Sequence, residues 1–309
     1  MSLALLFSPQ GSQSIGMARD LADAWPSAAE TFAQADEALD WSVSDVAWNG
    51  PAERLNDTRQ TQPCLVAASV ACLRALEGAM AAEGVELAPQ FVAGHSVGEY
   101  AALVAAGVLS APDAIRLVGK RGELMAAASV DGGMTAVIGL DRAAVEEAVA
   151  AAASPADLVV ANDNAPGQVV ISGTRAALIA AEPVLREAGA RRIIPLPVSG
   201  PFHSPWMAHV TDALAEAFET VEWSDARIPV VSNATGEPLN DAETIRNLLA
   251  EQVRSPVEWV ASVLRMADEG VDTFVECGPG AALTGMVKRI VPGARTLNVS
   301  DAASLAATV

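Results

Sequence analysis

The sequence predicts an α/β protein with a mostly parallel sheet and one inserted small subdomain. The length of 309 residues fits about two domains, or one large domain that carries an insertion. The composition, with 51% hydrophobic and 18% charged residues, is typical of a globular protein and not of a disordered or coiled-coil chain. Short apolar runs followed by helical patterns recur along the chain, and the stretch 131–198 departs from this order.

Four short apolar runs are each followed by a segment with helical periodicity. A strand followed by a helix, repeated along a chain, is typical of parallel strands whose connecting helices cover both faces of the sheet. In such a sheet the binding crevice lies at the carboxyl ends of the strands. The predicted strand and helix pairs are 3–7 with 29–39, 91–93 with 98–106, 228–231 with 242–252, and 273–276 with 282–290.

The stretch 131–198 contains strand and helix patterns in the order βαββαβ, which is typical of the ferredoxin-like unit. We therefore expect a large α/β subdomain, residues 1–130 and 199–309, and an inserted ferredoxin-like small subdomain, residues 131–198. The predicted strands are 134–140, 158–161, 169–172 and 192–198, and the predicted helices are 142–152 and 176–189.

The charge balance and the cysteine content argue against several classes of function. The 19 basic and 38 acidic residues give a net charge of −19 at pH 7, and a field of that sign repels nucleic acid and anionic lipid. No stretch approaches the ~18 uninterrupted apolar residues of a membrane helix. The three cysteines form no CxxC pair and no metal-binding motif is present, so we expect a cytoplasmic protein without a metal site.

The segment 94–98, with the sequence GHSVG, is the most specific local signal in the chain. It follows a predicted strand and precedes a predicted helix, which is the context of the nucleophile elbow in α/β-hydrolase folds. Gly94 and Gly98 are small enough for strand and helix to cross closely. Ser96 would lie at a helix N-terminus, where free N–H groups stabilise an oxyanion. We expect the large subdomain to be α/β-hydrolase-like; the alternative is an ordinary turn with a serine N-cap.

A serine nucleophile requires a base within hydrogen-bond reach, ~3 Å. The chain has three histidines. His95 precedes Ser96, and neighbouring side chains on a sharp turn point apart. His209 falls in the helical pattern 206–218, whereas His203 falls in a loop directly after the small subdomain, and loops at strand ends commonly build sites. We favour His203 as the base; the alternative is that it only satisfies backbone groups of its loop.

A predicted helix over residues 112–127 carries Arg116, Lys120 and Arg121. The guanidinium of Arg121 would hold a carboxylate with two parallel hydrogen bonds, a geometry that lysine does not offer. The alternative is that all three side chains lie on a solvated face. The glycines of the segment 277–285 lack the spacing of a phosphate-binding loop, so a tight turn between a strand and a helix is expected there.

Several segments together resemble the malonyl-CoA:acyl carrier protein transacylases of fatty acid synthesis and the related acyltransferase domains of polyketide synthesis. They occur in the order of that family and span nearly the whole chain. The resemblance implies ping-pong transfer of a malonyl group from malonyl-CoA to the phosphopantetheine thiol of acyl carrier protein, with no bound cofactor. The matching segments are 10–13 (QGSQ), 61–63 (TQP), 94–100 (GHSVGEY), 121–125 (RGELM), 164–168 (NAPGQ), 198–204 (VSGPFHS), Gln252 with 256–259 (PVEW), and 276–280 (ECGPG).

The resemblance also implies roles for individual residues. Ser96 matches the residue that holds the acyl group, and His203 matches its base. Arg121 matches the arginine that pairs with the malonyl carboxylate. The remaining implied roles are an oxyanion hole formed by the backbone N–H groups of Gln10 and Val97, orientation of the histidine by the backbone carbonyl of Gln252, malonyl selection by Phe202, and pocket lining by Gln62, Asn162 and Asn164.

The chain departs from the family pattern at two positions. The family usually has Phe-Pro-Gly before the first glutamine, whereas this chain has Ser8 and Pro9 there, and Pro9 fixes φ and lacks an N–H group. Ala281 stands where a lysine commonly follows the Gly-Pro-Gly turn. Because both this chain and acyl carrier proteins are acidic, docking requires a local basic patch, for which the candidates are Lys288, Arg289, Arg191 and Arg192.

Two other functions remain open at this stage. A serine esterase or thioesterase would use the same elbow, but such enzymes usually place their histidine late in the chain, and no histidine follows His209. A non-catalytic acyl-binding subunit would keep the fold without the chemistry.

Overall fold

A six-stranded sheet forms the centre of the larger subdomain in the computed structural model, which describes residues 2–128 and 131–309. Its strands are β1 (Leu3–Phe7), β2 (Phe91–Gly94), β7 (Val230–Val231), β8 (Pro238–Leu239), β9 (Thr273–Cys277) and β10 (Arg295–Val299). The strand order is β10-β9-β1-β2-β7-β8, and every pair is parallel except β7 with β8. The predicted mostly parallel sheet is confirmed, although β7 is shorter than the predicted strand 228–231.

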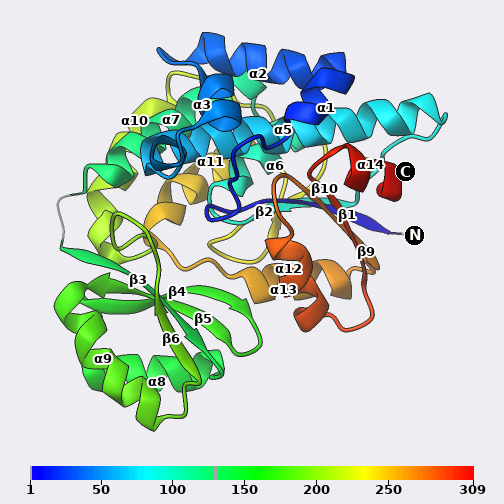
Figure 1. Ribbon diagram of the computed structural model, residues 1–309. Coiled ribbons are helices and arrows are strands. Elements are labelled where there is room, and N and C mark those ends of the chain that lie inside the picture. Colours follow the sequence, from blue (N-terminus) through cyan, green and yellow to red (C-terminus); the bar gives the residue numbers. More distant parts are fainter. Residues whose placement is uncertain (1, 129–130) are drawn as a thin grey trace.

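Helices cover both faces of this sheet, as predicted (Figure 1). Because successive strand residues point to opposite faces, Leu5 and Phe7 enter one hydrophobic core while Ala4 and Leu6 enter another. The helices α12 (Trp259–Asp268) and α13 (Ala282–Ile290) pack on the second core. The helices packed in the first core are α1 (Arg19–Ala24), α2 (Pro26–Ala38), α3 (Val43–Asn49), α4 (Ala52–Leu55), α5 (Thr58–Ala82), α6 (Gly98–Ala106), α7 (Ala111–Ala126), α10 (Ala208–Phe218), α11 (Ala242–Glu251) and α14 (Ala302–Thr308).

The sequence patterns predict no helix over residues 58–82, where the structure has its longest helix, α5. By length and composition α5 is apolar enough to cross a membrane, with a mean hydropathy of 1.6 over 18 residues, although Arg74 and Glu77 interrupt it, so that it contains no run of ~18 uninterrupted apolar residues. However, 72% of that apolar window is buried inside the protein. A helix that is hydrophobic around most of its circumference is typical of the interior of a large domain, and α5 packs against both α2 and α7.

The four-stranded second sheet confirms the ferredoxin-like small subdomain. Its strands follow the antiparallel order β4-β5-β3-β6, and its two helices share a separate hydrophobic core with them. All its elements lie within the predicted insertion 131–198, whose boundaries stay a prediction. The elements are β3 (Gly132–Ile138), α8 (Arg142–Ala152), β4 (Leu158–Ala165), β5 (Gln168–Thr174), α9 (Arg175–Glu187) and β6 (Arg192–Pro195).

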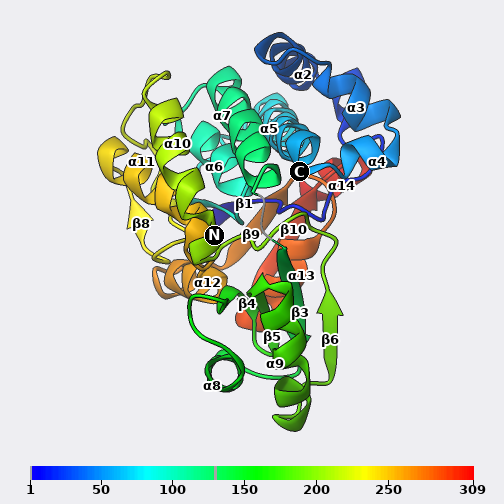
Figure 2. The same ribbon diagram turned by 90° about the vertical axis from the view of Figure 1, so that its left-hand side faces the viewer.

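Backbone and side-chain contacts tie the small subdomain to the larger one beside α12 and α13 (Figure 2). The Val257 N–H donates to the Ala161 carbonyl at 2.8 Å, and the Asp163 N–H donates to the Val257 carbonyl at 3.0 Å. Arg142 of α8 forms a two-pronged ion pair with Glu258, which precedes α12. These contacts, which we call the latch, fix the position of β4 against the larger subdomain.

Candidate active site

The segment between β2 and α6 forms the predicted sharp elbow. Ser96 adopts a φ of 53°, which places it in the left-handed region that non-glycine residues rarely occupy. A Cβ atom on Gly94 would lie 2.0 Å from the carbonyl carbon of Gly98, and one on Gly98 would lie 2.2 Å from the Phe7 carbonyl oxygen. Strand and helix therefore cross so closely that neither glycine position has room for a side chain.

Ser96 and His203 meet at this elbow, as predicted. The Ser96 Oγ lies 2.7 Å from the His203 Nε2, although the residues are 107 positions apart in the sequence. The Nδ1 of the same ring lies 2.9 Å from the Gln252 carbonyl oxygen and 3.1 Å from the Ser255 carbonyl oxygen. Because carbonyl oxygens only accept hydrogen bonds, Nδ1 carries the proton and Nε2 accepts from the serine hydroxyl.

The surroundings of His203 keep its imidazole neutral. Burial is the main cause, and the nearby Arg121 cation adds to it; together they lower the pKa of His203 to about 3. The neutral ring can take a proton from Ser96, and two backbone carbonyls take the place of an acidic third residue. The predicted role of the Gln252 carbonyl in orienting the ring agrees with this geometry.

The other two histidines do not reach the serine hydroxyl. His95 is buried, and its Nε2 lies 2.7 Å from Asn164 Oδ1 while its ring packs against Trp259. Burial lowers the pKa of His95 to about 4. His209 is exposed on α10. The structure thus places His203, and neither alternative, at the serine.

Arg121 points from α7 into the same site and is 1% exposed. Its Nη1 donates to Gln62 Oε1 at 2.9 Å, and its Nη2 donates to Gln252 Oε1 at 2.9 Å and to Ser96 Oγ at 3.1 Å. The Nε is buried without a hydrogen-bond partner. Within residues 2–128 and 131–309, Arg121 forms no ion pair, so its charge is held by neutral acceptors only. The solvated-face alternative for this residue is therefore wrong.

The two backbone N–H groups expected to form an oxyanion hole are free in the described part of the chain. Neither the Gln10 N–H nor the Val97 N–H donates to any of those residues. The Ser96 N–H, by contrast, donates to Asn233 Oδ1 at 2.6 Å, and the Asn233 Nδ2 donates to the Gly94 carbonyl at 2.6 Å. Asn233 thus clamps the strained elbow from both sides.

A buried carboxylate lies beneath the elbow. Glu99 is 3% exposed, and its Oε2 accepts hydrogen bonds from Gln252 Nε2 at 2.6 Å and from the Asn233 N–H at 3.3 Å. Burial raises the pKa of Glu99 to about 7. Asn233 and Glu99 are not among the residues predicted from the sequence. The signal for Asn233 was its position just after β7, at the carboxyl end of a parallel strand.

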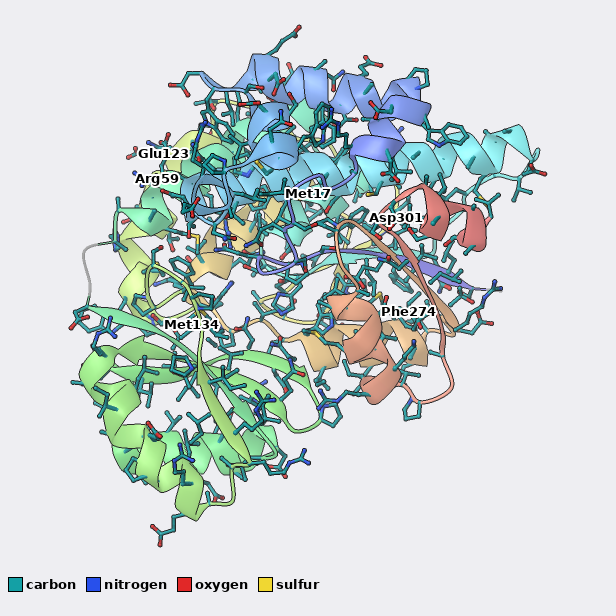
Figure 3. All side chains as sticks on the ribbon, viewed as in Figure 1. Met17, Arg59, Glu123, Met134, Phe274 and Asp301 are labelled. Atoms are coloured by element: carbon teal, nitrogen blue, oxygen red, sulfur yellow. The ribbon has the colours of Figure 1, made fainter. Side chains whose placement is uncertain are left out.

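A cavity of about 340 Å³ opens over these groups between the two subdomains. Its walls combine the polar site with apolar side chains from both subdomains, among them Met134 of β3, which is labelled in Figure 3. Seven of the site residues predicted from the sequence line this cavity: Gln10, Ser96, Arg121, Asn162, Asn164, Phe202 and His203. Gln62 is not among the lining residues, and the expectation that it lines the pocket is corrected: it is fully buried behind Arg121, which it holds.

The two departures from the family pattern lie at different distances from the cavity. Pro9 is buried and lines it, next to Gln10. Ala281 is exposed just before α13, in the predicted tight turn, where Glu276 accepts from the backbone N–H groups of Leu283 and Thr284. Pro9 therefore shapes the cavity wall directly, whereas Ala281 faces solvent.

The four residues predicted to form a basic patch lie on one element of each subdomain. Lys288 and Arg289 are exposed on α13, the helix from which Met286 lines the cavity, and Arg191 and Arg192 are exposed at the start of β6. Arg289 reaches across to the small subdomain and donates to Gln168 Oε1 at 2.6 Å. Neither the two α13 residues nor Arg191 and Arg192 line the cavity, so the patch lies outside it.

Comparisons with known proteins give a consistent result. Residues 4–307 match the family model described as the acyl transferase domain. The chain is 41% identical over 302 residues, 97% of its length and 93% of the relative's, to the malonyl CoA-acyl carrier protein transacylase of Bacillus subtilis. It is 41% identical over 308 residues to the protein of the same name in Escherichia coli K12, covering 99% and 98% of the two chains.

Solved structures agree with this result over the whole chain. An acyl carrier protein S-malonyltransferase from Vibrio cholerae superposes with a TM-score of 0.94 at 41% identity and covers 100% of both chains. A malonyl-transacylase solved in complex with its type II PKS acyl-carrier protein superposes with a TM-score of 0.93 at 41% identity, covering 99% and 98%.

Proposed function

The chain belongs to the acyl transferase family, among the malonyl CoA-acyl carrier protein transacylases, and we propose that it transfers malonyl through an ester on Ser96. The donor is malonyl-CoA and the acceptor is the phosphopantetheine thiol of an acyl carrier protein. The observation that supports this route best is the contact of 2.7 Å between Ser96 Oγ and His203 Nε2, with the Arg121 guanidinium on the same hydroxyl. In the steps of this transfer, side chains and backbone N–H groups of this chain supply the nucleophile, the base and the oxyanion hole.

In the first half-reaction, Ser96 Oγ attacks the thioester carbonyl while His203 Nε2 takes its proton. The carbonyl oxygen becomes an oxyanion, which accepts hydrogen bonds from the free N–H groups of Gln10 and Val97. The carbon–sulfur bond then breaks, and CoA leaves with the proton from His203. The malonyl group remains as an ester on Ser96.

The second half-reaction runs the same steps in reverse with a different thiol. The phosphopantetheine thiol gives its proton to His203 and attacks the ester, and the same N–H groups hold the second oxyanion. The Ser96 oxygen leaves with the proton from His203. In both halves the imidazolium is supported at Nδ1 by the Gln252 and Ser255 carbonyls, so a ping-pong cycle needs no carboxylate in the dyad.

Selection of malonyl rests on Arg121 and on the apolar wall. A malonyl carboxylate would give the buried guanidinium the ion-pair partner that no described residue supplies. We assign the contacts along the rest of the acyl thioester to Asn162, Asn164 and Phe202, which line the cavity. In Arg121→Ala, the ratio of malonyl to acetyl loading on Ser96 should fall; an unchanged ratio contradicts this role.

Mass spectrometry after brief exposure to malonyl-CoA tests the proposal. We expect a malonyl adduct on the peptide that carries Ser96, and no adduct in Ser96→Ala. Added acyl carrier protein should remove the adduct and become malonylated. Free malonate without carrier acylation would identify a hydrolase instead, and absence of any adduct would identify a non-catalytic subunit.

We further propose that the protein works in the cytoplasm. The three cysteines, Cys64, Cys72 and Cys277, are all buried and unpaired, as is usual in a reducing compartment. Within the described residues, no group of three or more His, Cys, Asp and Glu side chains is arranged to hold a metal ion.

A further inference from the structure

Two buried groups of opposite charge share one amide beneath the active site. The Oε1 of Gln252 accepts from Arg121 Nη2 at 2.9 Å, and the Nε2 of the same amide donates to Glu99 Oε2 at 2.6 Å. The Nε2 also donates to the Ser96 carbonyl at 3.0 Å. A chain of hydrogen bonds therefore runs from the guanidinium through the amide to the carboxylate.

The Glu99 carboxylate, together with the Ser96 carbonyl, holds the Gln252 amide in one orientation. A carboxylate only accepts hydrogen bonds and a guanidinium only donates them. The opposite amide orientation would place N–H groups against Arg121 and a carbonyl oxygen against Glu99, and both contacts would be repulsive. With Glu99 in place, the amide oxygen faces Arg121 and helps to hold the guanidinium at Ser96.

Glu99 also compensates the charge of Arg121 when no substrate is bound. Arg121 is 1% exposed and forms no ion pair in the described part of the chain, and a buried charge without compensation is costly. Glu99, which is 3% exposed and one amide away, is the carboxylate whose field acts on Arg121. The arrival of a substrate carboxylate at Arg121 would add a second negative charge to this buried group.

We infer that Glu99 is a positioning residue for Arg121 and takes up one proton from solvent when a malonyl carboxylate binds there. The inference rests on the proposed function. The charges balance: guanidinium and carboxylate sum to zero in the free site, and guanidinium, malonyl carboxylate and neutral Glu99 sum to zero in the occupied site.

The contacts of Glu99 leave a place for this proton. Both described hydrogen bonds go to Oε2, and no donor among residues 2–128 and 131–309 bonds Oε1. Protonation of Oε1 therefore leaves the bonds from Gln252 and Asn233 intact. Burial raises the pKa of Glu99 to about 7, so a further negative charge nearby favours proton uptake near neutral pH.

The other titratable groups around Glu99 do not change charge in this range. Burial lowers the pKa of His95, just after β2, to about 4 and that of His203, before the helical turn at Pro205–Met207, to about 3, so both rings are neutral. Tyr100, on the same helix as Glu99, has its pKa raised by burial and is neutral too. Arg121 from α7 remains the cation that faces Glu99.

The ratio of malonyl to acetyl loading on Ser96, measured from about pH 6 to about pH 9, tests the inference. An ionisation that changes malonyl and acetyl loading by the same factor does not change this ratio. In the wild type we expect it to fall about tenfold over this range, because an ionised Glu99 opposes the malonyl carboxylate alone. In Glu99→Gln, which has no proton to take up, the ratio should not change with pH.

Glu276→Gln is the matched control. Glu276 is also fully buried and has a raised pKa, but its hydrogen bonds go to Ser8, Leu283 and Thr284, away from Arg121. This variant should keep the pH dependence of the wild type. A purely structural role for Glu99 would lower malonyl and acetyl loading together, and that result overturns the inference.

A second measurement keeps the inference testable if Glu99→Gln does not fold. In weakly buffered solution with a pH indicator, Ser96→Ala should take up about one proton per chain on binding malonyl-CoA near pH 8 and none on binding acetyl-CoA. If the wild type loads malonyl but the ratio of malonyl to acetyl loading does not change with pH, the inference is refuted and the proposed function stands. Absence of malonyl loading at every pH refutes the function itself.

Discussion

The small subdomain is built from contacts between residues of one continuous stretch of the chain, whereas the catalytic cleft is built from contacts between residues that lie far apart in the sequence. In the small subdomain, β3, β4, β5 and β6 pair within one stretch of the chain and share a core with their two helices. In the cleft, single side-chain contacts join distant residues: Ser96 and His203 are 107 positions apart, Arg121 and Gln252 are 131 apart, and Ser96 and Asn233 are 137 apart. Local sequence patterns predict the first kind of structure, whereas the second depends on how the whole fold closes.

Replacement of His203 should have the largest effect and should be confined to the cleft. His203→Ala leaves Ser96 without a base, so we expect malonyl loading of Ser96 to fall by about 10³-fold or more. His209→Ala, at an exposed position of α10, should load as the wild type does. Burst kinetics with malonyl-CoA measure both. Loading that survives in His203→Ala would show that another group takes the proton.

A glycine-to-alanine substitution should destabilise the protein at the tightly packed elbow of the cleft but not at an open position of the small subdomain. In Gly98→Ala the new Cβ would lie 2.2 Å from the Phe7 carbonyl oxygen, so the free energy of unfolding should fall by about 3 kcal/mol. Gly133 on β3 is the matched position in the small subdomain, where the nearest atom to a new Cβ is Leu178 Cδ1 at 3.9 Å. Gly133→Ala should leave the stability unchanged or raise it by about 0.5 kcal/mol. Urea denaturation of both variants measures the difference, and equal losses would contradict it.

The sequence predicted most of what depends on local pattern. The order βαββαβ, the helix α8 with both its ends, and the strand, turn and helix around Ser96 are confirmed. The structure also places His203 at Ser96, the histidine that its loop position distinguished from a helical histidine and from one adjacent to the serine; its role as the base stays a prediction.

The missed features share a physical cause. The helix α5 is apolar around most of its surface, so it lacks the one-sided periodicity that marks a helix in a sequence. Glutamates are almost never fully buried, so nothing in the sequence singles out Glu99 as a buried group. Gln62 was placed on the pocket wall by resemblance, but its partner Arg121 stands between it and the cavity. All three features depend on burial or on contacts between residues far apart in the sequence, and neither can be read from a local sequence pattern.

Loss of the ion pair of the latch should test whether the two regions act as one unit. Arg142→Ala removes the ion pair with Glu258 that holds the small subdomain against the cleft. Because Arg142 is partly exposed, we expect a loss of less than about 1 kcal/mol in unfolding free energy. The KM for malonyl-CoA should rise about threefold, because the two backbone hydrogen bonds of the latch then hold Asn162 and Asn164 of β4 at the cleft without the ion pair. Arg186→Ala, which breaks a surface ion pair with Glu182 on α9, is the control and should change neither quantity. An equal KM in both variants would show that the Arg142–Glu258 ion pair is irrelevant to binding.

Charge reversal at the basic patch should have the smallest effect, because it lies outside the cavity. In the double variant Lys288→Glu and Arg289→Glu, the apparent KM for acyl carrier protein should rise about threefold, and more at low salt. Kinetics with free pantetheine should not change, since that acceptor enters the cavity without docking a protein. The control is the reversal of Arg116 and Lys120, whose side chains are half-exposed on α7 and do not line the cavity. Equal effects on carrier protein and on free pantetheine would show that the charges act on the cleft and that the carrier docks elsewhere.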